Sequence, residues 1–191
     1  MGLDRSTLLR EELGVTVLSL PLEIHPEIPV GGITLEERWA GRYGEAVAMY
    51  ERIEAQLRDV GMPFNRPARV PNTRRALATA EWVRANAADD AFVALERSLH
   101  EAHFVDNRPL DDPEVVDGLV SGAGADAAGA RRAYEAGELD GALESAASLA
   151  SSVGVTGTPA WLLARRALIP GAVGRDVFRR VVSRLTSSGT A

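Results

Sequence analysis

The chain has 191 residues, a net charge of −6 and no cysteine, and all 21 of its basic residues are arginine. These residues therefore provide no disulfide, no cysteine ligand for zinc, no redox pair of thiols, no lysine Schiff base and no phosphate-binding lysine. We also expect no nucleic-acid partner, because neutralising phosphates requires clustered, unpaired cations and these arginines are interleaved with carboxylates.

Hydropathy indicates a globular protein without a membrane partner. Hydrophobic residues make up 46% of the chain, which is enough to bury a core, yet no apolar run approaches the roughly 18 residues of a membrane span. Residues 1–15 carry charges where a secretion signal has an apolar stretch. We therefore expect a cytoplasmic location. The alanine content, with arginine in place of lysine, is typical of a GC-rich bacterial genome.

The first residues predict a helix followed by a strand. Leu9 and Leu13 share a helical face, Asp4 or Ser6 can cap its start, and Gly14 can end it. Residues 15–20 are apolar and β-branched, which predicts a buried strand. Two prolines and two glycines make residues 26–32 a loop.

Residues 33–153 are predicted to be almost entirely helical, because apolar residues recur three or four positions apart. Asn72 or Thr73 can cap one of these helices. Asp111 and Asp112 could be mistaken for a catalytic pair of carboxylates. Since Pro113 follows them, a helix start is the better interpretation.

The pattern changes after Gly154, where residues 160–164 and 167–169 predict a β-hairpin. Its turn lacks the Gly or Asn that a tight hairpin turn prefers, which leaves the register open. The apolar face of a last helix, around residues 177–185, should pack on this hairpin.

Four short stretches carry a family resemblance, namely residues 21–26, 72–77, 154–159 and 170–172. In order and spacing they resemble the DsbA-like thioredoxin family, especially the cytoplasmic branch that includes 2-hydroxychromene-2-carboxylate isomerases and kappa-class glutathione transferases. The resemblance implies an α/β fold, a thioredoxin-like sheet with a large all-helical insertion. Residues 1–32 and 154–191 would form the two half-domains, and residues 33–153 the insertion.

The same resemblance implies the site residues. Thr158 and Pro159 would be joined by a cis peptide bond, and the backbone before the proline would pair with an extended substrate. Asn72 lies in another of the matching stretches and is a further candidate for substrate binding. No residue is assigned to catalysis or to a metal.

The sequence departs from the family at its start. Members normally begin with a strand and then carry Cys-x-x-Cys, or a serine, at the first turn of the first helix, where the helix N-terminus stabilises a thiolate. This N-terminal strand is missing here, which would leave residues 15–20 without their parallel neighbour. A chain that begins too late, a degenerate homologue, or a partner that supplies the strand would each explain this, and we expect the first. For Ser6 and Thr7 we expect helix capping rather than a nucleophilic role.

The three histidines are candidates for functional groups. His100 and His103 flank Glu101 and are three residues apart, whereas a zinc-binding helix places two histidines four apart, and Asp106 is the only further ligand nearby. We expect structural roles for this pair, and a local hydrogen bond for His25.

Three functions follow as alternatives from the resemblance. The first is the family activity, thiol–disulfide oxidoreduction on a protein substrate, with the dithiol absent from this chain. The second is a glutathione-dependent isomerase or transferase, in which Arg74 or Arg75 would bind an anionic substrate. The third is a non-catalytic peptide-binding module. We expect no cofactor, with glutathione and a homodimer as open alternatives.

Overall fold

The computed structural model describes residues 2–187 of the chain. They fall into two compact units, which are described separately. One unit is discontinuous and combines the chain up to residue 20 with the chain from residue 146 onward. The other runs from Pro21 to Ser145. The domain boundaries predicted from the resemblance, with half-domains over residues 1–32 and 154–191 and an insertion over residues 33–153, stay a prediction.

The discontinuous unit is built around the predicted hairpin. Strands β3 (Ala160–Leu163) and β4 (Ala167–Pro170) pair antiparallel, with Trp161 opposite Ile169. Ala164 and Arg165 occupy the turn with φ values of 50° and 55°, so two residues with side chains adopt the left-handed conformation that usually favours glycine. The prediction of a hairpin is confirmed, and this turn fixes its register.

Helices from both ends of the chain cover this hairpin. Helix α1 (Gly2–Thr7) continues into one π-helical stretch, η1 (Leu8–Glu12), and helix α9 (Arg175–Ser187) follows the hairpin. The buried core that they share consists of Leu8, Leu9, Trp161, Leu163, Ile169 and Phe178.

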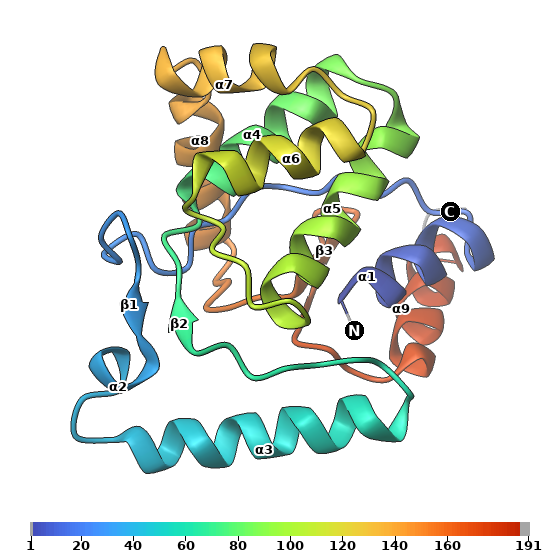
Figure 1. The fold of residues 1–191 in the computed structure, drawn as a ribbon. Helices are drawn as coiled ribbons and strands as arrows, with labels where there is room; N and C mark the ends of the chain where they lie inside the picture. The colour runs from blue at the N-terminus through green and yellow to red at the C-terminus, as the bar shows by residue number, and fades with distance from the viewer. Residues whose placement is uncertain (1, 188–191) are drawn as a thin grey trace. The chain divides into compact units, whose positions relative to one another are not determined.

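The first and last helices lie side by side and are joined by ion pairs (Figure 1). A nitrogen of Arg175 lies 2.9 Å from a carboxylate oxygen of Asp4, and another pairs with Glu12. Arg179 lies 2.7 Å from the second oxygen of Glu12. These bridges connect residues more than 160 positions apart, so the unit depends on both ends of the chain.

Two expectations for the N-terminal segment were wrong. The helix already includes Gly2, so Ser6 and Thr7 lie inside it, and neither side chain caps it. Residues 15–20 do not form a strand, because no neighbouring strand among the described residues is available to pair with them. Gly14, at φ 64°, does end the helical region as predicted.

The second unit is mainly helical. Its first half holds α2 (Leu35–Arg38) and the long α3 (Tyr43–Asp59). Two short strands, β1 (Ile33–Thr34) and β2 (Arg69–Val70), pair antiparallel, which the sequence had not indicated. Four more helices follow: α4 (Arg74–Asn86), α5 (Asp89–Phe104), α6 (Pro113–Gly122) and α7 (Ala127–Glu135). Helix α8 (Asp140–Ser152) leads from this unit into the other.

Helices α4 to α7 enclose the core of the second unit. Its buried residues are Ala76, Val83, Phe92, Leu95, Ala102, Leu110, Val116 and Val120. The starts of α6 and α7 are fixed by aspartates, since Asp112 accepts a hydrogen bond from the Glu114 N–H and Asp126 one from the Gly129 N–H, each 2.9 Å long. The interpretation of Asp112 as a helix start is therefore confirmed. Among residues 2–187, no helix has both the length and the apolar character that crossing a membrane requires.

Candidate substrate-binding site

The loop that leads into β3 carries the two site residues predicted with most support. The peptide bond between Thr158 and Pro159 is cis, as the resemblance implies. The Pro159 carbonyl accepts a 2.8 Å hydrogen bond from the Gly171 N–H, which closes the base of the hairpin. Thr158 is exposed, and its N–H, carbonyl and hydroxyl bond to no other described residue. Pro159 is therefore held by a hydrogen bond, whereas the backbone N–H and carbonyl of the preceding Thr158 are not bonded to any described residue.

The start of helix α1 lies against this loop. A Cβ atom placed on Gly2 would lie 3.3 Å from Cβ of Pro159, so the two residues are nearly in contact. Arg5 fixes the helix further along, because its Nε donates a 2.8 Å hydrogen bond to the Val173 carbonyl. Sequence reasoning had not paired Gly2 with Pro159, since 157 positions separate them and no local signal links them.

A second open stretch of backbone belongs to the same unit. Val15 donates its N–H to the Leu9 carbonyl at 2.8 Å, but residues 16–20 form no hydrogen bond with any other described residue. Leu18 and Leu20 are 61% and 48% exposed. The segment whose apolar, β-branched composition predicted a strand therefore has backbone N–H and carbonyl groups that are not bonded to any described residue.

Asn72, the third predicted site residue, belongs to the second unit and is locally bonded. Its Nδ2 donates to the Ile28 carbonyl at 2.6 Å, and its Oδ1 accepts from the Arg74 N–H at 3.0 Å. The side chain therefore fixes the start of α4 and anchors the loop that contains Ile28. Because both of its polar atoms are used, its structural role is evident, and its role in substrate binding stays a prediction.

The arginines considered for anionic substrates are also engaged. Arg74 pairs with Glu23 at 2.8 Å and with Asp140, and these bonds raise the pKa of its guanidinium, the bond to Asp140 most strongly. The Arg75 guanidinium lies over the ring of Tyr134, 4.3 Å from its centroid. Arg74 is therefore not free to bind an anion without giving up a contact, whereas stacking occupies only the face of the Arg75 guanidinium and leaves its N–H donors available.

The histidine pair has structural surroundings. The ring of His103 meets Phe104 edge-on at 4.4 Å between centroids, and His100 Nδ1 lies 2.7 Å from the Glu96 carbonyl oxygen. Burial, with a smaller contribution from His100, lowers the pKa of His103 to about 4, so this ring is neutral near pH 7. Within the described part of the chain, no three His, Cys, Asp or Glu side chains are grouped as a metal site would require. His25 forms the local contacts expected of it, with Glu27 at 3.2 Å and Arg38 at 3.1 Å.

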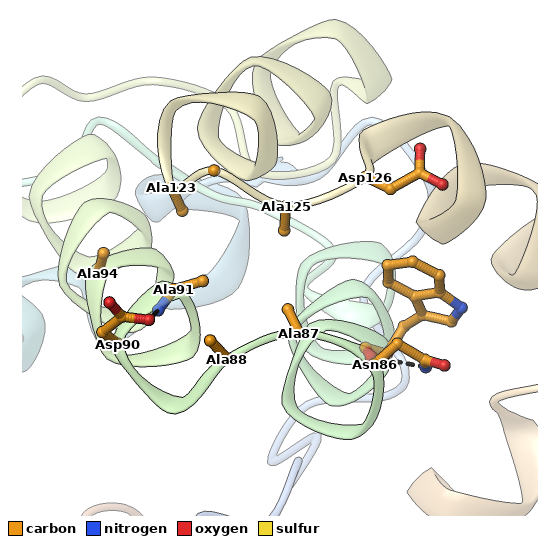
Figure 2. Close-up of a pocket in the computed structure, with 11 residues that line it drawn as sticks. Asn86, Ala87, Ala88, Asp90, Ala91, Ala94, Ala123, Ala125 and Asp126 are labelled. Carbon is orange, nitrogen blue, oxygen red and sulfur yellow. Dashed lines mark hydrogen bonds between the residues drawn. The ribbon is translucent and has the colours of Figure 1, made fainter.

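A hollow of about 680 Å³ opens in the second unit, where the ends of α4 and α6 meet the start of α5 (Figure 2). Alanine methyl groups form much of its wall, Asp90 lies at one side, and Trp82 is among the residues that line it. The carboxylates of Asp90 and Asp126 accept hydrogen bonds from the Ala91 and Gly129 N–H groups. These two carboxylates thus serve the helix starts, while Asn86 donates to the Trp82 carbonyl at the end of α4. None of the predicted site residues lines this hollow.

Comparisons with known proteins agree with this architecture. A sequence model of the DsbA-like thioredoxin domain matches residues 4–183. The structure is similar to that of a probable DsbA oxidoreductase from Streptomyces coelicolor, with a TM-score of 0.82 and 20% sequence identity over 99% of this chain and 83% of that chain. It is also similar to a 2-hydroxychromene-2-carboxylate isomerase, with a TM-score of 0.67 and 17% identity over 98% of this chain and 89% of that chain. No curated protein matches the sequence.

At this level of identity the two structures establish the fold alone. They confirm the predicted α/β class, a thioredoxin-like fold with a helical insertion. These two structures correspond to the DsbA-like family and to the isomerase that the sequence stretches had indicated.

Proposed function

Because the chain belongs to the DsbA-like thioredoxin family, we propose that it binds polypeptides in an extended conformation at the loop that precedes β3. The observation that carries this proposal is the open backbone of Thr158, an exposed residue whose N–H and carbonyl bond to no described residue. An extended polypeptide offers the complementary pair, one carbonyl and one N–H, at the spacing of a strand.

The family activity is thiol–disulfide oxidoreduction, and we propose that this chain serves that chemistry by holding the substrate. None of its 191 residues is a cysteine, so none of them can form the thiolate that attacks a disulfide. What the chain contributes is then the position of the polypeptide. The hydrogen bond from the Gly171 N–H to the Pro159 carbonyl supports this role, because it holds the residue that directly follows Thr158 in place.

Binding can be measured with a fluorescein-labelled insulin B chain whose cysteines have been carboxymethylated, by titrating protein and following anisotropy. Thr158→Pro removes one N–H that bonds nothing in the folded protein, whereas Thr158→Ala keeps it. We expect the alanine variant to bind within ~2-fold of the unchanged protein and the proline variant to bind ~10-fold more weakly. Absence of any anisotropy change would overturn the proposal.

Turnover provides the second measurement. In a mixture of intact insulin and dithiothreitol, insulin should precipitate at the same rate with and without the protein, because none of the 191 residues carries a thiol. Faster precipitation would overturn the assignment of a purely binding role.

Glutathione is the alternative ligand, favoured by the similarity of the fold to an isomerase of the same family. The ion pairs of Arg74 count against it, since a glutathione carboxylate would have to displace them. The stacking of Arg75 on Tyr134 does not, because it leaves the N–H donors of that guanidinium available. Titration calorimetry with reduced glutathione distinguishes the two. Heat of binding to glutathione, together with no change in the anisotropy of the labelled B chain, would identify glutathione rather than a polypeptide as the ligand.

A further inference from the structure

A small cavity lies in the second unit, between the segment that contains β2 and the loop that follows α5. Its volume is about 160 Å³, and its lining includes Pro67, Pro71 and Pro109. Pockets that hold drug-sized ligands are larger, at roughly 300–1,000 Å³, so this cavity suits a small molecule. A proline ring loses almost no conformational freedom when a ligand packs against it, so this apolar wall favours binding.

Backbone hydrogen bonds hold both sides of the cavity in place. The Asn65 N–H donates to the Phe104 carbonyl at 2.7 Å, which ties the segment before β2 to the end of α5. The Arg108 N–H donates to the Ala102 carbonyl at 2.7 Å, and Asn107 turns the loop with a φ of 54°. The loop is thereby folded back onto the end of α5. A cavity that is formed before the ligand arrives requires little ordering when the ligand binds.

Two residues of opposite charge, Arg108 and Asp111, line this cavity without pairing with each other. Among residues 2–187, neither the guanidinium of Arg108 nor the carboxylate of Asp111 has a hydrogen bond or an ion pair. Pro109 lies between them in the sequence, and its carbonyl accepts a 3.3 Å hydrogen bond from the Asp112 N–H, so the segment that carries both charges is fixed. The cavity therefore presents one cation and one anion that are both available to a ligand.

The remaining charged residue of the lining, Arg69, is already engaged. Its guanidinium donates a hydrogen bond to the Gly31 carbonyl. Hydrogen bonds from Thr34 and, to a smaller extent, the charge of Arg69 lower the pKa of the Glu37 carboxylate. Arg69 thus serves the contact between β2 and the segment before it, and Arg108 is the cation that we assign to the ligand.

The ring of His103 adds polar atoms to the lining without adding a charge. Burial, more than the nearby His100, lowers its pKa to about 4, so the ring is neutral near pH 7. A neutral imidazole has one N–H donor and one acceptor nitrogen, and here neither nitrogen bonds to another described residue. His103 can therefore bond to a polar ligand while Arg108 and Asp111 determine which charges the ligand carries.

We propose that this cavity binds a small zwitterionic α-amino acid, with its carboxylate on Arg108, its ammonium group on Asp111 and a small apolar side chain against the prolines. A guanidinium binds a carboxylate through two parallel N–H donors, and a carboxylate accepts charged hydrogen bonds from an ammonium group. A simple acid or amine would leave one of the two charges without a partner, so the zwitterion is favoured. The site is independent of the loop of Thr158 and Pro159 and goes beyond the proposed function.

The test is an NMR titration of the full ¹⁵N-labelled chain with L-valine and two analogues. L-Valinamide keeps the ammonium group and lacks the carboxylate, whereas 3-methylbutanoate keeps the carboxylate and lacks the ammonium group. We expect L-valine to bind with a Kd of ~1 mM or below and to shift the amide signals of residues 68–70 and 103–108. Each analogue should bind at least ~10-fold more weakly, because it loses one charged contact.

Two variants address the protein side. Arg108→Gln should weaken binding of L-valine by at least ~10-fold without weakening that of L-valinamide, and Asp111→Asn should weaken L-valine without weakening 3-methylbutanoate. Arg97→Gln and Asp106→Asn are the matched controls, since both residues are exposed and neither lines the cavity. Both controls should bind L-valine within ~2-fold of the unchanged protein. Urea unfolding shows whether each variant retains the fold, and the analogues test the same contacts without any substitution.

Three results would overturn the proposal. The first is the absence of shifts at residues 68–70 and 103–108 with L-valine at ~20 mM, well above the expected Kd. The second is an analogue that binds as tightly as L-valine, because the ligand would then be a simple acid or amine. The third is an equal loss of affinity in the variants and their matched controls, which would mean that general surface charge, and not this cavity, binds the amino acid. None of these results bears on polypeptide binding at Thr158, which the labelled insulin B chain tests separately.

Discussion

The indole ring of Trp161 meets the ring of Phe178 edge-on, with 4.8 Å between the centroids and 86° between the planes. Trp161 comes from strand β3 and Phe178 from helix α9, so this contact joins the hairpin to the last helix. Phe178 has no exposed surface. The ring pair is therefore the centre of the core that supports the loop of Thr158 and Pro159.

Phe178→Ala should destabilise the discontinuous unit by about 3–5 kcal/mol, because it removes a fully buried ring and leaves a cavity. The loss can be measured by urea unfolding, followed by tryptophan fluorescence, to which Trp161 contributes together with Trp39 and Trp82. A loss below about 1 kcal/mol would contradict the assignment of Phe178 to the core.

Two helical glycines should respond in opposite ways to alanine. In Gly129→Ala the new Cβ would lie 2.9 Å from Cζ2 of Trp82 and 2.5 Å from the Asp126 carboxylate, which is too close for either contact. We expect a loss of about 1–3 kcal/mol in the free energy of unfolding. Gly118→Ala is the matched control, since nothing lies within 4 Å of that position, and it should stabilise α6 by up to ~1 kcal/mol. Equal effects of the two substitutions would show that the packing at Gly129 is not as described.

The neighbouring aspartates before α6 should differ in importance. Asp112 accepts a hydrogen bond from the Glu114 N–H, whereas Asp111 accepts none from the described residues. Asp112→Ala should therefore cost about 0.5–2 kcal/mol, and Asp111→Ala less than ~0.5 kcal/mol. Chemical denaturation of both variants provides the comparison. A larger loss for Asp111→Ala would reverse the assignment of the cap.

Stability should depend on pH through His103. Its pKa is about 4 in the folded protein against 6.5 in the unfolded chain, so between these values the unfolded chain binds the proton that the folded protein excludes. Stability from this group is complete above pH 6.5 and is lost as the pH falls towards 4, by up to ~3 kcal/mol.

His103→Gln removes the titrating group and keeps a polar side chain. The difference in unfolding free energy between the two proteins should change steadily from pH 7 to pH 5. A difference that is independent of pH would mean that His103 titrates alike in both states. Titration of the ring by NMR measures its pKa directly.

Arg74 should contribute more than an exposed ion pair. It bridges Asp140 to Glu23, and the Glu23 side chain is only 10% exposed, so removing the arginine leaves a nearly buried carboxylate without its partner. We expect Arg74→Met to cost about 1–3 kcal/mol, measured by denaturation. Arg180→Met removes the exposed pair with Asp176 and should cost less than ~0.5 kcal/mol. Similar losses for both would place the Arg74 bridge among ordinary surface pairs.

The parts of the fold that were predicted correctly depend on local patterns. The hairpin, the last helix and the helix start at Asp112 follow from periodicity and capping residues that are close together in the sequence. Residues 15–20 had the composition of a strand, but a strand exists only with a neighbour, which composition cannot supply. Strands β1 and β2 have two residues each, too few for a pattern.

The candidate site was predictable only in part. The resemblance gave Thr158 and Pro159, and the polar side chain of Asn72 was recognisable as a candidate cap. The approach of Gly2 to Pro159 and the unpaired backbone of residues 16–20 depend on which distant segments come together. Such contacts have no local signal in one sequence.

The ion pairs between Arg175, Glu12 and Asp4 have a consequence for synthesis of the protein. The discontinuous unit combines residues up to 20 with residues from 146 onward, and the ribosome synthesises the 125 residues from 21 to 145 between these two parts. At the usual rates of translation this takes roughly 6–25 s. During that time helix α1 and the apolar segment after it have left the ribosome without the hairpin and α9 that will cover them. The unit that contains the first residues to be synthesised is therefore completed last. We expect a chaperone to bind the nascent N-terminal segment.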